Sequence, residues 1–282
     1  MKEYIYGKNT VKEALLSNKN SIKLLVTKNN EEFINLAKKK KVEFNIVDNG
    51  YLNKMINGNH QGVALEIESY SYSSVEDIIS ETKLKYPLIV MLDGLEDPHN
   101  LGAILRTCDA SGVDGVIIGK NRSVRLNSTV AKVSTGAIEY VKVAEVTNLT
   151  NTIKYLKEKG YWIVGAEACD KSVLYTDIKY DMPVCLVIGS EGRGISRLVS
   201  ENCDFLVKIP MVGHVNSLNA SVSCSILIYE IIKNDEGKEN IVALIGRNDF
   251  YRLENAILLS GHLDVVGASD EMFVPSLKNG RI

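Results

Sequence analysis

The segment from Gly189 to Gly194 combines three glycines with one carboxylate, Glu191, directly after an apolar run at 184–188. Because Pro183 and the first glycine bound this run, it predicts a short buried strand. A strand that ends in a glycine-rich loop presents backbone N–H groups and one carboxylate at the carboxyl edge of a sheet, where open α/β sheets bind ligands. A plain turn between strand and helix is the other interpretation, since glycine-rich turns are common.

Basic side chains form two further candidate sites. No acidic residue occurs from 115 to 138. Two lysines and two arginines occupy the loop 119–128 and the helix after it: Lys120, Arg122, Arg125 and Lys132. A second run lies near the N-terminus: Lys38, Lys39 and Lys40, followed by Lys41. Such clusters suit contacts to phosphates, which supply most of the affinity for nucleic acids. Solvated surface is the alternative for both, and cations at a helix end also suit the helix dipole.

Composition indicates an ordinary globular protein. The 282 residues are 45% hydrophobic and 24% charged, and we expect one large or two ordinary domains. No apolar run approaches the roughly 20 residues of a membrane helix, and the N-terminus has no apolar signal core. The net charge is −2, so any nucleic-acid binding must come from a local basic patch. These features predict a cytoplasmic protein without a membrane partner.

Cysteine and histidine usage gives no sign of a metal site or of disulfides. The five cysteines are odd in number, widely spaced and without a CxxC pair, and they lie in apolar surroundings. We therefore expect buried free thiols in a reducing compartment. The four histidines show no metal-ligand spacing, so no metal is predicted.

The N-terminal region 1–70 alternates short strands with helices, which predicts a small α/β sandwich. The expected strands are 21–27, 42–47 and 62–67. One helix is expected to end near Ser17, and two more are expected at 31–40 and 51–56. Thr10 and Glu13 have the spacing of a capping box for the first helix, and Asn30 is placed to cap the second. The polar residues 71–86 predict a linker with one short helical piece at 75–79.

Residues 87–235 repeat a strand–helix pattern, which predicts an α/β domain with a parallel sheet covered by helices. The expected strands are 88–92, 113–118, 141–146, 161–166, 184–188 and 205–210, and the expected helices are 101–111, 129–138, 149–159, 195–203 and 217–233. Asn100 is placed to cap the first of these helices. The last helix is apolar on nearly every side, which is typical of a helix buried in a core or a subunit interface.

Residues 236–282 follow a charged stretch and form a C-terminal extension of unknown role. A strand at 241–245 and a helix at 252–259 are expected there. Nothing in this extension has residues at a spacing that would carry chemistry.

Three segments, 97–106, 187–194 and 209–222, resemble in order and spacing the three motifs of SpoU-type (TrmH-like) RNA 2′-O-ribose methyltransferases of the SPOUT superfamily. The resemblance spans about residues 88–234, and the small-residue turn 134–137 also has a counterpart in the family. The N-terminal region 1–70 looks like the family's substrate-binding domain, which is related to L30e-like RNA-binding folds. Together the two parts are most similar to bacterial members that methylate a guanosine ribose of large-subunit (23S) rRNA. Ala220 departs from the valine that close relatives often carry.

The resemblance implies a deep trefoil knot at the C-terminal end of the sheet, a homodimer, and S-adenosylmethionine as methyl donor. It places donor binding on Gly189, Glu191, Ile209, Met211, Ser217, Leu218 and Asn219, and catalysis on Arg106, Asn100, Glu191 and Asn219. In the family, backbone groups of the second and third motifs hold the adenosine, and apolar side chains can sandwich its ring.

Arg106 is the residue that family proposals cast as the group that activates the ribose hydroxyl. A guanidinium is effectively always protonated, so we prefer a role in clamping the adjoining phosphate and stabilising the developing alkoxide. Asn100, Glu191 and Asn219 would orient the hydroxyl and the arginine. The structural alternatives are a helix cap for Asn100, a turn residue for Glu191 and a buried helical amide for Asn219.

Three other functions are alternatives. The loop reads G-x-x-G-x-G late in the chain, whereas a dinucleotide-binding oxidoreductase has G-x-G-x-x-G near its first strand. A non-catalytic RNA-binding or ribosome-assembly protein would not need the set of Asn100, Arg106, Glu191 and Asn219. A methyltransferase acting on tRNA would share the chemistry, although the separate N-terminal unit favours rRNA.

Overall fold

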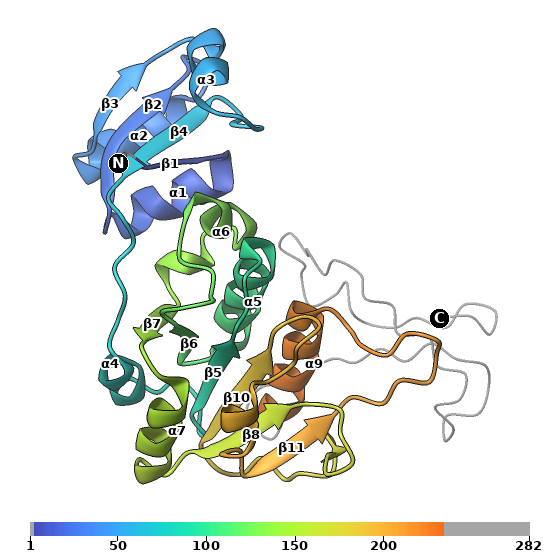
Figure 1. The fold of residues 1–282 in the computed structure, drawn as a ribbon. Coiled ribbons are helices and arrows are strands. Elements are labelled where there is room, and N and C mark those ends of the chain that lie inside the picture. Colours follow the sequence, from blue (N-terminus) through green and yellow to red (C-terminus); the bar gives the residue numbers. More distant parts are fainter. Residues whose placement is uncertain (1–2, 234–282) are drawn as a thin grey trace, which may run out of the picture. The chain divides into compact units, whose positions relative to one another are not determined.

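The structure is a computed structural model in which residues 3–233 are described (Figure 1). The strand expected at 241–245 and the helix expected at 252–259 lie outside the described residues. The described part contains two sheets, one in the N-terminal region 1–70 and one in the region that carries the three motifs.

The N-terminal sheet is mixed, with the strand order β1-β4-β2-β3. Its strands are β1 (Glu3–Tyr6), β2 (Ser21–Val26), β3 (Glu43–Ile46) and β4 (Val63–Ile67), and its helices are α1 (Lys8–Ser17), α2 (Glu31–Lys40) and α3 (Asn49–Met55). Strand β4 runs antiparallel to β1 and β2, and β3 runs parallel to β2. Successive β2 residues face opposite sides: Leu24 joins the cluster that includes α1 and α2, and Leu25 joins the one that includes α3. This confirms the small α/β domain.

Two predicted helix caps in this domain are wrong. Helix α1 begins at Lys8, because Gly7 turns the chain directly from β1 with a φ of 92°, and Thr10 is buried inside the helix. Asn30 does occupy the N-cap position of α2, but its side chain makes no capping hydrogen bond. Its amide instead donates to Thr27 Oγ1 at 2.8 Å and to the carbonyl of Gly62 at 3.3 Å, which fastens the loop after β2 to the start of β4.

The second sheet is parallel, with the strand order β7-β6-β5-β10-β8-β11-β9 within the described chain. Its strands are β5 (Leu88–Asp93), β6 (Gly115–Gly119), β7 (Lys142–Val146), β8 (Trp162–Ala166), β9 (Val173–Leu174), β10 (Val184–Gly189) and β11 (Phe205–Lys208). Apart from the very short β9, the predicted strands lie close to the observed ones. The predicted α/β class with a parallel sheet is confirmed, and the knot stays a prediction.

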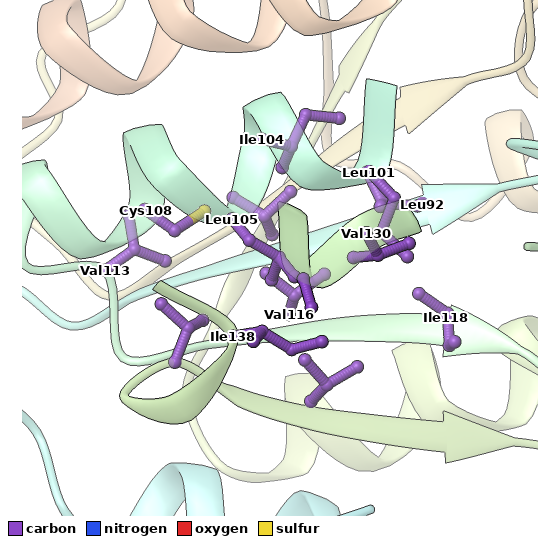
Figure 2. Packing of buried hydrophobic residues seen from close by; sticks show 14 of the residues in the cluster. Leu92, Leu101, Ile104, Leu105, Cys108, Val113, Val116, Ile118, Val130 and Ile138 are labelled. Atoms are coloured by element: carbon purple, nitrogen blue, oxygen red, sulfur yellow. The ribbon is translucent and has the colours of Figure 1, made fainter. Parts of the chain in front are cut away.

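Helices lie on both faces of the parallel sheet, and a short helix, α4 (Val75–Ser80), precedes it. The helices that follow α4 are α5 (Pro98–Ser111), α6 (Ser128–Val133), α7 (Leu149–Glu158), α8 (Arg197–Ser200) and α9 (Ala220–Ile232). On one face, Leu101 and Leu105 of α5 lie against Leu92 and Val116 of the sheet (Figure 2), and Ile104 belongs to the same buried cluster. The opposite face forms a separate cluster that includes α7. Since both faces are covered, the central strands are apolar throughout rather than alternating.

Three predicted helices are shorter in the structure. The helix predicted at 129–138 breaks after α6, because Thr135 and Gly136 adopt φ values of 51° and 98°. The helix predicted at 195–203 shortens to α8, which spans Arg197–Ser200. The last helix, predicted from 217, begins later, at Ala220.

The order of the strands also creates a switch point. After β5 the chain builds β6 and β7 to one side, and the later strands lie on the other side, with β10 next to β5. Ligands of open α/β sheets bind in the crevice at the carboxyl ends of the strands at such a point. The loops that follow β5 and β10 are therefore where a site is expected.

All five cysteines are free thiols, as predicted. Cys108, Cys185 and Cys224 are buried, whereas Cys169 and Cys203 are only partly buried. Burial raises the pKa of the Cys185 and Cys224 thiols, which keeps them protonated and unreactive. Among the described helices, none is long and apolar enough to span a membrane.

Candidate active site

A cavity of about 380 Å³ lies at the carboxyl ends of β10 and β11. Its lining includes six of the seven residues predicted to bind the donor: Gly189, Glu191, Ile209, Met211, Ser217 and Leu218. Asn219 is not among the lining residues, although Leu218 and Ala220 on either side of it are. The second and third motifs therefore enclose one cavity, called the donor cavity below.

The glycine-rich loop that forms one wall is closed on itself by two backbone hydrogen bonds. Ser190 N donates to Gly194 O at 3.1 Å, and Gly194 N donates to Ser190 O at 2.9 Å. A Cβ atom on Gly189 would lie 2.1 Å from the carbonyl carbon of Gly194, so only glycine allows this closure. The closed loop presents Glu191 at the edge of the cavity.

Asn100, Glu191 and Asn219 come together from the three motifs. Asn100 Nδ2 donates to Glu191 Oε1 at 2.9 Å, and Asn219 Nδ2 donates to the same oxygen at 2.8 Å. Asn219 Nδ2 also donates to Asn100 Oδ1 at 2.9 Å. Two amide donors on one carboxylate oxygen fix the orientation of Glu191, since charge-assisted hydrogen bonds are the stronger ones.

Asn100 does not cap its helix, which corrects one structural alternative. Helix α5 begins at Pro98, and Asp97 is the N-cap, with its carboxylate accepting from His99 N at 2.9 Å. This hydrogen bond is the main cause that lowers the pKa of Asp97. Because Asp97 caps the helix, the buried Asn100 side chain is available to contact Glu191.

Asn219 is the N-cap of α9 rather than a buried amide inside it. Its Oδ1 accepts from Ser221 N at 2.9 Å and from Val222 N at 3.4 Å, while its Nδ2 makes the contacts to Glu191 and Asn100. One side chain thus starts the last helix and joins the motif network.

Arg106 lies at an exposed position of α5, outside the lining of the donor cavity. The sequence resemblance grouped it with Asn100 of the same helix. The two residues are more than one helical turn apart, however, and their spacing puts them on different sides of α5. The structure therefore does not place Arg106 at the wall that Asn100 forms.

The predicted RNA-binding cations separate into two groups. Lys120 and Arg122 line a second cavity of about 640 Å³, whose lining also includes Asn100 and Glu191. Arg125 forms an ion pair with Glu145 at 3.3 Å, and Lys132 lies 4.7 Å from the centre of the Tyr6 ring. Lys38 lies over Phe44, Lys40 donates to the carbonyl of Leu16, and Lys39 is exposed.

This second cavity, called the switch-point cavity below, was not predicted as a unit. Loops after β5, β6, β7 and β10 form it, and Glu191 belongs to the linings of both cavities. Arg193 also lines it, and its place in the glycine-rich loop was the sequence signal available for it. Two cavities that share one oriented carboxylate can hold a donor and an acceptor on either side of it.

Solved structures confirm the fold class. The AdoMet-bound rRNA methyltransferase of Sinorhizobium meliloti has a TM-score of 0.71 at 24% identity, covering 82% of this chain and 87% of that one. A structure described as an RNA 2′-O ribose methyltransferase has a TM-score of 0.65 at 25% identity, covering 82% and 88%. The fold is that of an RNA methyltransferase.

Sequence comparisons give the family. The SpoU rRNA Methylase family matches residues 87–229, and the RNA 2′-O ribose methyltransferase substrate-binding family matches residues 4–73. A protein of Staphylococcus haemolyticus, provisionally named a TrmH family tRNA/rRNA methyltransferase, is 52% identical over 236 residues, covering 81% of this chain and 94% of that protein. A similarly named protein of Staphylococcus epidermidis is 49% identical over the same length. The chain belongs to the SpoU rRNA methylase family.

Proposed function

We propose that this methyltransferase transfers a methyl group from S-adenosylmethionine to a ribose 2′-hydroxyl of RNA, and that a guanosine of large-subunit (23S) rRNA is the target. The observation that carries the proposal is the hydrogen-bonded network of Asn100, Glu191 and Asn219, which joins all three motifs at the wall between two cavities. The matches to the SpoU and substrate-binding families support RNA ribose as the acceptor.

The donor cavity has a suitable size and lining for S-adenosylmethionine. Its volume of about 380 Å³ falls within the range of roughly 300–1,000 Å³ that is typical of small-molecule sites. Its apolar side chains are suited to an adenine ring: Ile188, Val207, Ile209, Leu218 and Leu227. Its polar side chains are suited to the amino-acid part of the donor: Asn216, Ser217 and Ser223. When bound, S-adenosylmethionine supplies an electrophilic methyl group on a sulfonium.

The network residues position the acceptor. A ribose hydroxyl must lie in line with the methyl group and lose its proton, and positioning alone can contribute about 7–11 kcal/mol in favourable cases. We assign to Glu191, which is held by two amides, the role of accepting a hydrogen bond from that hydroxyl. We assign to Arg106 a clamp on the adjoining phosphate and electrostatic stabilisation of the developing alkoxide.

RNA approaches through the switch-point cavity in this proposal. Lys120, Arg122 and Arg193 line it and supply positive charge for backbone phosphates. Because Asn100 and Glu191 also line it, a nucleotide bound there would lie beside the network. We place this reaction in the cytoplasm, since the free thiols fit a reducing compartment.

We also propose a homodimer built on α9 and the segment before it. Val212 and Val215 are 102% and 64% exposed, and Val222 and Tyr229 on α9 are 46% and 40% exposed. A second copy covering these side chains would remove apolar surface from water, which is the main driving force for association. The exposed Arg106 lies on α5, which packs on α9, so dimerisation can bring it to the partner's network.

The chemistry is tested by incubating the protein with methyl-labelled S-adenosylmethionine and RNA, followed by alkaline hydrolysis. A 2′-O-methyl group blocks cleavage of the neighbouring phosphodiester, so the label should be recovered in alkali-resistant dinucleotides. Label recovered in mononucleotides would mean base methylation and would contradict the proposal. A protein that binds RNA but does not bind the labelled donor would favour a non-catalytic RNA-binding protein.

A further inference from the structure

The N-terminal domain contains a cavity of about 570 Å³ that shares no lining residue with the two cavities of the active site. It lies where the parallel strands β2 and β3 end. The last residue of β3, the loops after β2 and β3 and the first turn of α3 line it: Thr27, Lys28, Asn29, Ile46, Val47, Asp48, Asn49 and Tyr51. Its volume is in the range of sites that bind small organic molecules.

An exposed aromatic ring forms one side of this cavity. Tyr51 is 48% exposed, and Ile46 at the end of β3 is 50% exposed. The next residue on α3, Leu52, is fully buried in the cluster with Leu25 and Ala64. The buried leucine anchors the helix, and the tyrosine ring therefore stays at the surface. Unpaired nucleobases stack on such exposed aromatic rings in RNA-binding proteins.

The walls of the cavity are held by hydrogen bonds. Tyr51 N donates to Asp48 Oδ1 at 2.7 Å, which caps α3. On the other side, Thr27 N donates to the carbonyl of Gly62 at 2.9 Å, and Asn30 Nδ2 donates to Thr27 Oγ1 at 2.8 Å. Because these loops are already ordered, binding a ligand costs less conformational entropy.

Polar groups around the ring match the rest of a nucleotide. Lys28, Asn29 and Asn49 are exposed in the cavity lining. An ammonium group suits a phosphate, and an amide can both donate to and accept from the edge of a base. By contrast, Lys38 and Lys40 at the C-terminal end of α2 already contact Phe44 and the carbonyl of Leu16 within their own domain.

We infer that this cavity binds one unpaired nucleotide of the RNA substrate, with its base stacked on Tyr51 and its phosphate near Lys28. The inference rests on the proposed function, since it supplies a second point of RNA contact for the same enzyme. The match of residues 4–73 to a substrate-binding family supports RNA as the occupant. A base paired within a duplex cannot enter, so the site is selective for single-stranded segments.

Binding of fluorescein-labelled single-stranded RNA, followed by anisotropy, tests the stacking contact. Tyr51→Ala should weaken binding by about 5- to 150-fold, the range for loss of one base–aromatic stack. Tyr51→Phe keeps the ring and should bind like the wild type. Ile22→Ala is the matched control, because Ile22 is a 42% exposed side chain of the same domain outside the cavity. S-adenosylmethionine affinity should be the same in the wild type and in every variant.

Photo-crosslinking with RNA that contains 4-thiouridine tests the location, and the adduct should map to the segment 43–55. Equal RNA affinity of the wild type and Tyr51→Ala would overturn the inference, and so would equal affinity for a duplex of the same length. If either result is found and the wild-type protein still transfers the methyl group, the proposed function stands. If the wild type binds RNA through Tyr51 but transfers no methyl group, the proposed function fails and this site stands. No RNA binding at all overturns both.

Discussion

Asn100 and Glu191 are far apart in sequence and are joined by a hydrogen bond of 2.9 Å from Asn100 Nδ2 to Glu191 Oε1. The bond connects the first turn of α5 to the glycine-rich loop after β10. Since β5 and β10 are neighbours in the sheet, the segments that follow them meet at the switch point. The oriented carboxylate is thus a consequence of the strand order, and it lies in the linings of both cavities.

Asn219 makes two sets of contacts, one that caps α9 and one to Glu191 and Asn100, and substitutions can separate them. Asn219→Ser keeps an N-cap oxygen for α9 but is too short to reach Glu191, so stability should stay near the wild-type value while kcat falls by roughly 100-fold, as for other losses of positioning. Asn219→Ala removes the cap as well and should cost about 1 kcal/mol of unfolding free energy. Urea unfolding and methyl-transfer kinetics measure the two effects. Wild-type kcat in Asn219→Ser would show that the network has no catalytic role.

Arg106→Ala should abolish methyl transfer and leave donor binding nearly intact, because Arg106 lies outside the donor cavity. Arg106→Lys keeps the charge but loses the bidentate fork, so partial activity is expected. Calorimetric titration with S-adenosylmethionine and single-turnover assays check both. Substantial turnover by Arg106→Ala would refute its role.

A dimer-specific test of the same residue uses mixed subunits. If Arg106 acts on the partner's network, a mixture of Arg106→Ala and Glu191→Gln subunits should recover activity that neither variant has alone. Failure to recover activity in a heterodimer purified with two different tags would place Arg106 and Glu191 in the same subunit's site.

Gly189→Ala should damage the donor cavity. Its Cβ would overlap the Gly194 carbonyl carbon at 2.1 Å, and overpacking of this kind typically costs about 1–3 kcal/mol. Gly213→Ala is the control, since a Cβ there meets no atom of residues 3–233 within 4 Å, and the substitution should change stability by less than about 0.5 kcal/mol. Thermal unfolding and donor titration report on both. A Gly189→Ala protein with wild-type donor affinity would show that loop closure does not shape the cavity.

Glu139 makes stability depend on pH. It is 6% exposed, and its burial raises the pKa above the ordinary 4.5, although the hydroxyl of Ser17, which donates at 2.8 Å, opposes this. Its contribution to stability is fully present below the unfolded pKa and is lost as pH rises through the folded pKa. Glu139→Gln, which is always neutral, should therefore gain stability over the wild type as pH rises from 5 to 8. A difference in unfolding free energy that is the same at every pH would contradict this.

Local pattern predicted most of the fold, because the strands are short apolar runs bounded by turn residues. The strand Val184–Gly189 and the loop after it are examples. The local sequence pattern was less accurate where contacts with the rest of the fold decide which hydrogen bonds a side chain makes. Asn30 has the right type and position for a cap, but its side chain is held by hydrogen bonds from Nδ2 to Thr27 and to Gly62, and its oxygen makes no capping hydrogen bond. Helix α5 is a different case, because the local signals Asp97 and Pro98 start it earlier than the apolar pattern indicates.

The sequence motifs named the three residues of the hydrogen-bonded network, but not how these residues are arranged in space. The motifs named Asn100, Glu191 and Asn219, but their mutual hydrogen bonds depend on the order of the strands, which is not readable from local sequence. The switch-point cavity was missed for the same reason, since Lys120 and Arg193 come from loops that are adjacent only in the folded sheet.

The most direct test uses purified protein, methyl-labelled S-adenosylmethionine, and separate rRNA and tRNA from cells that lack the gene, with the label mapped by nuclease digestion and mass spectrometry. The account predicts label on the 2′-oxygen of one guanosine of large-subunit rRNA. Label in tRNA would keep the chemistry and contradict the substrate. Label in neither RNA, from a protein that binds the donor, would contradict methylation of free RNA and direct the search to a ribosome-assembly intermediate.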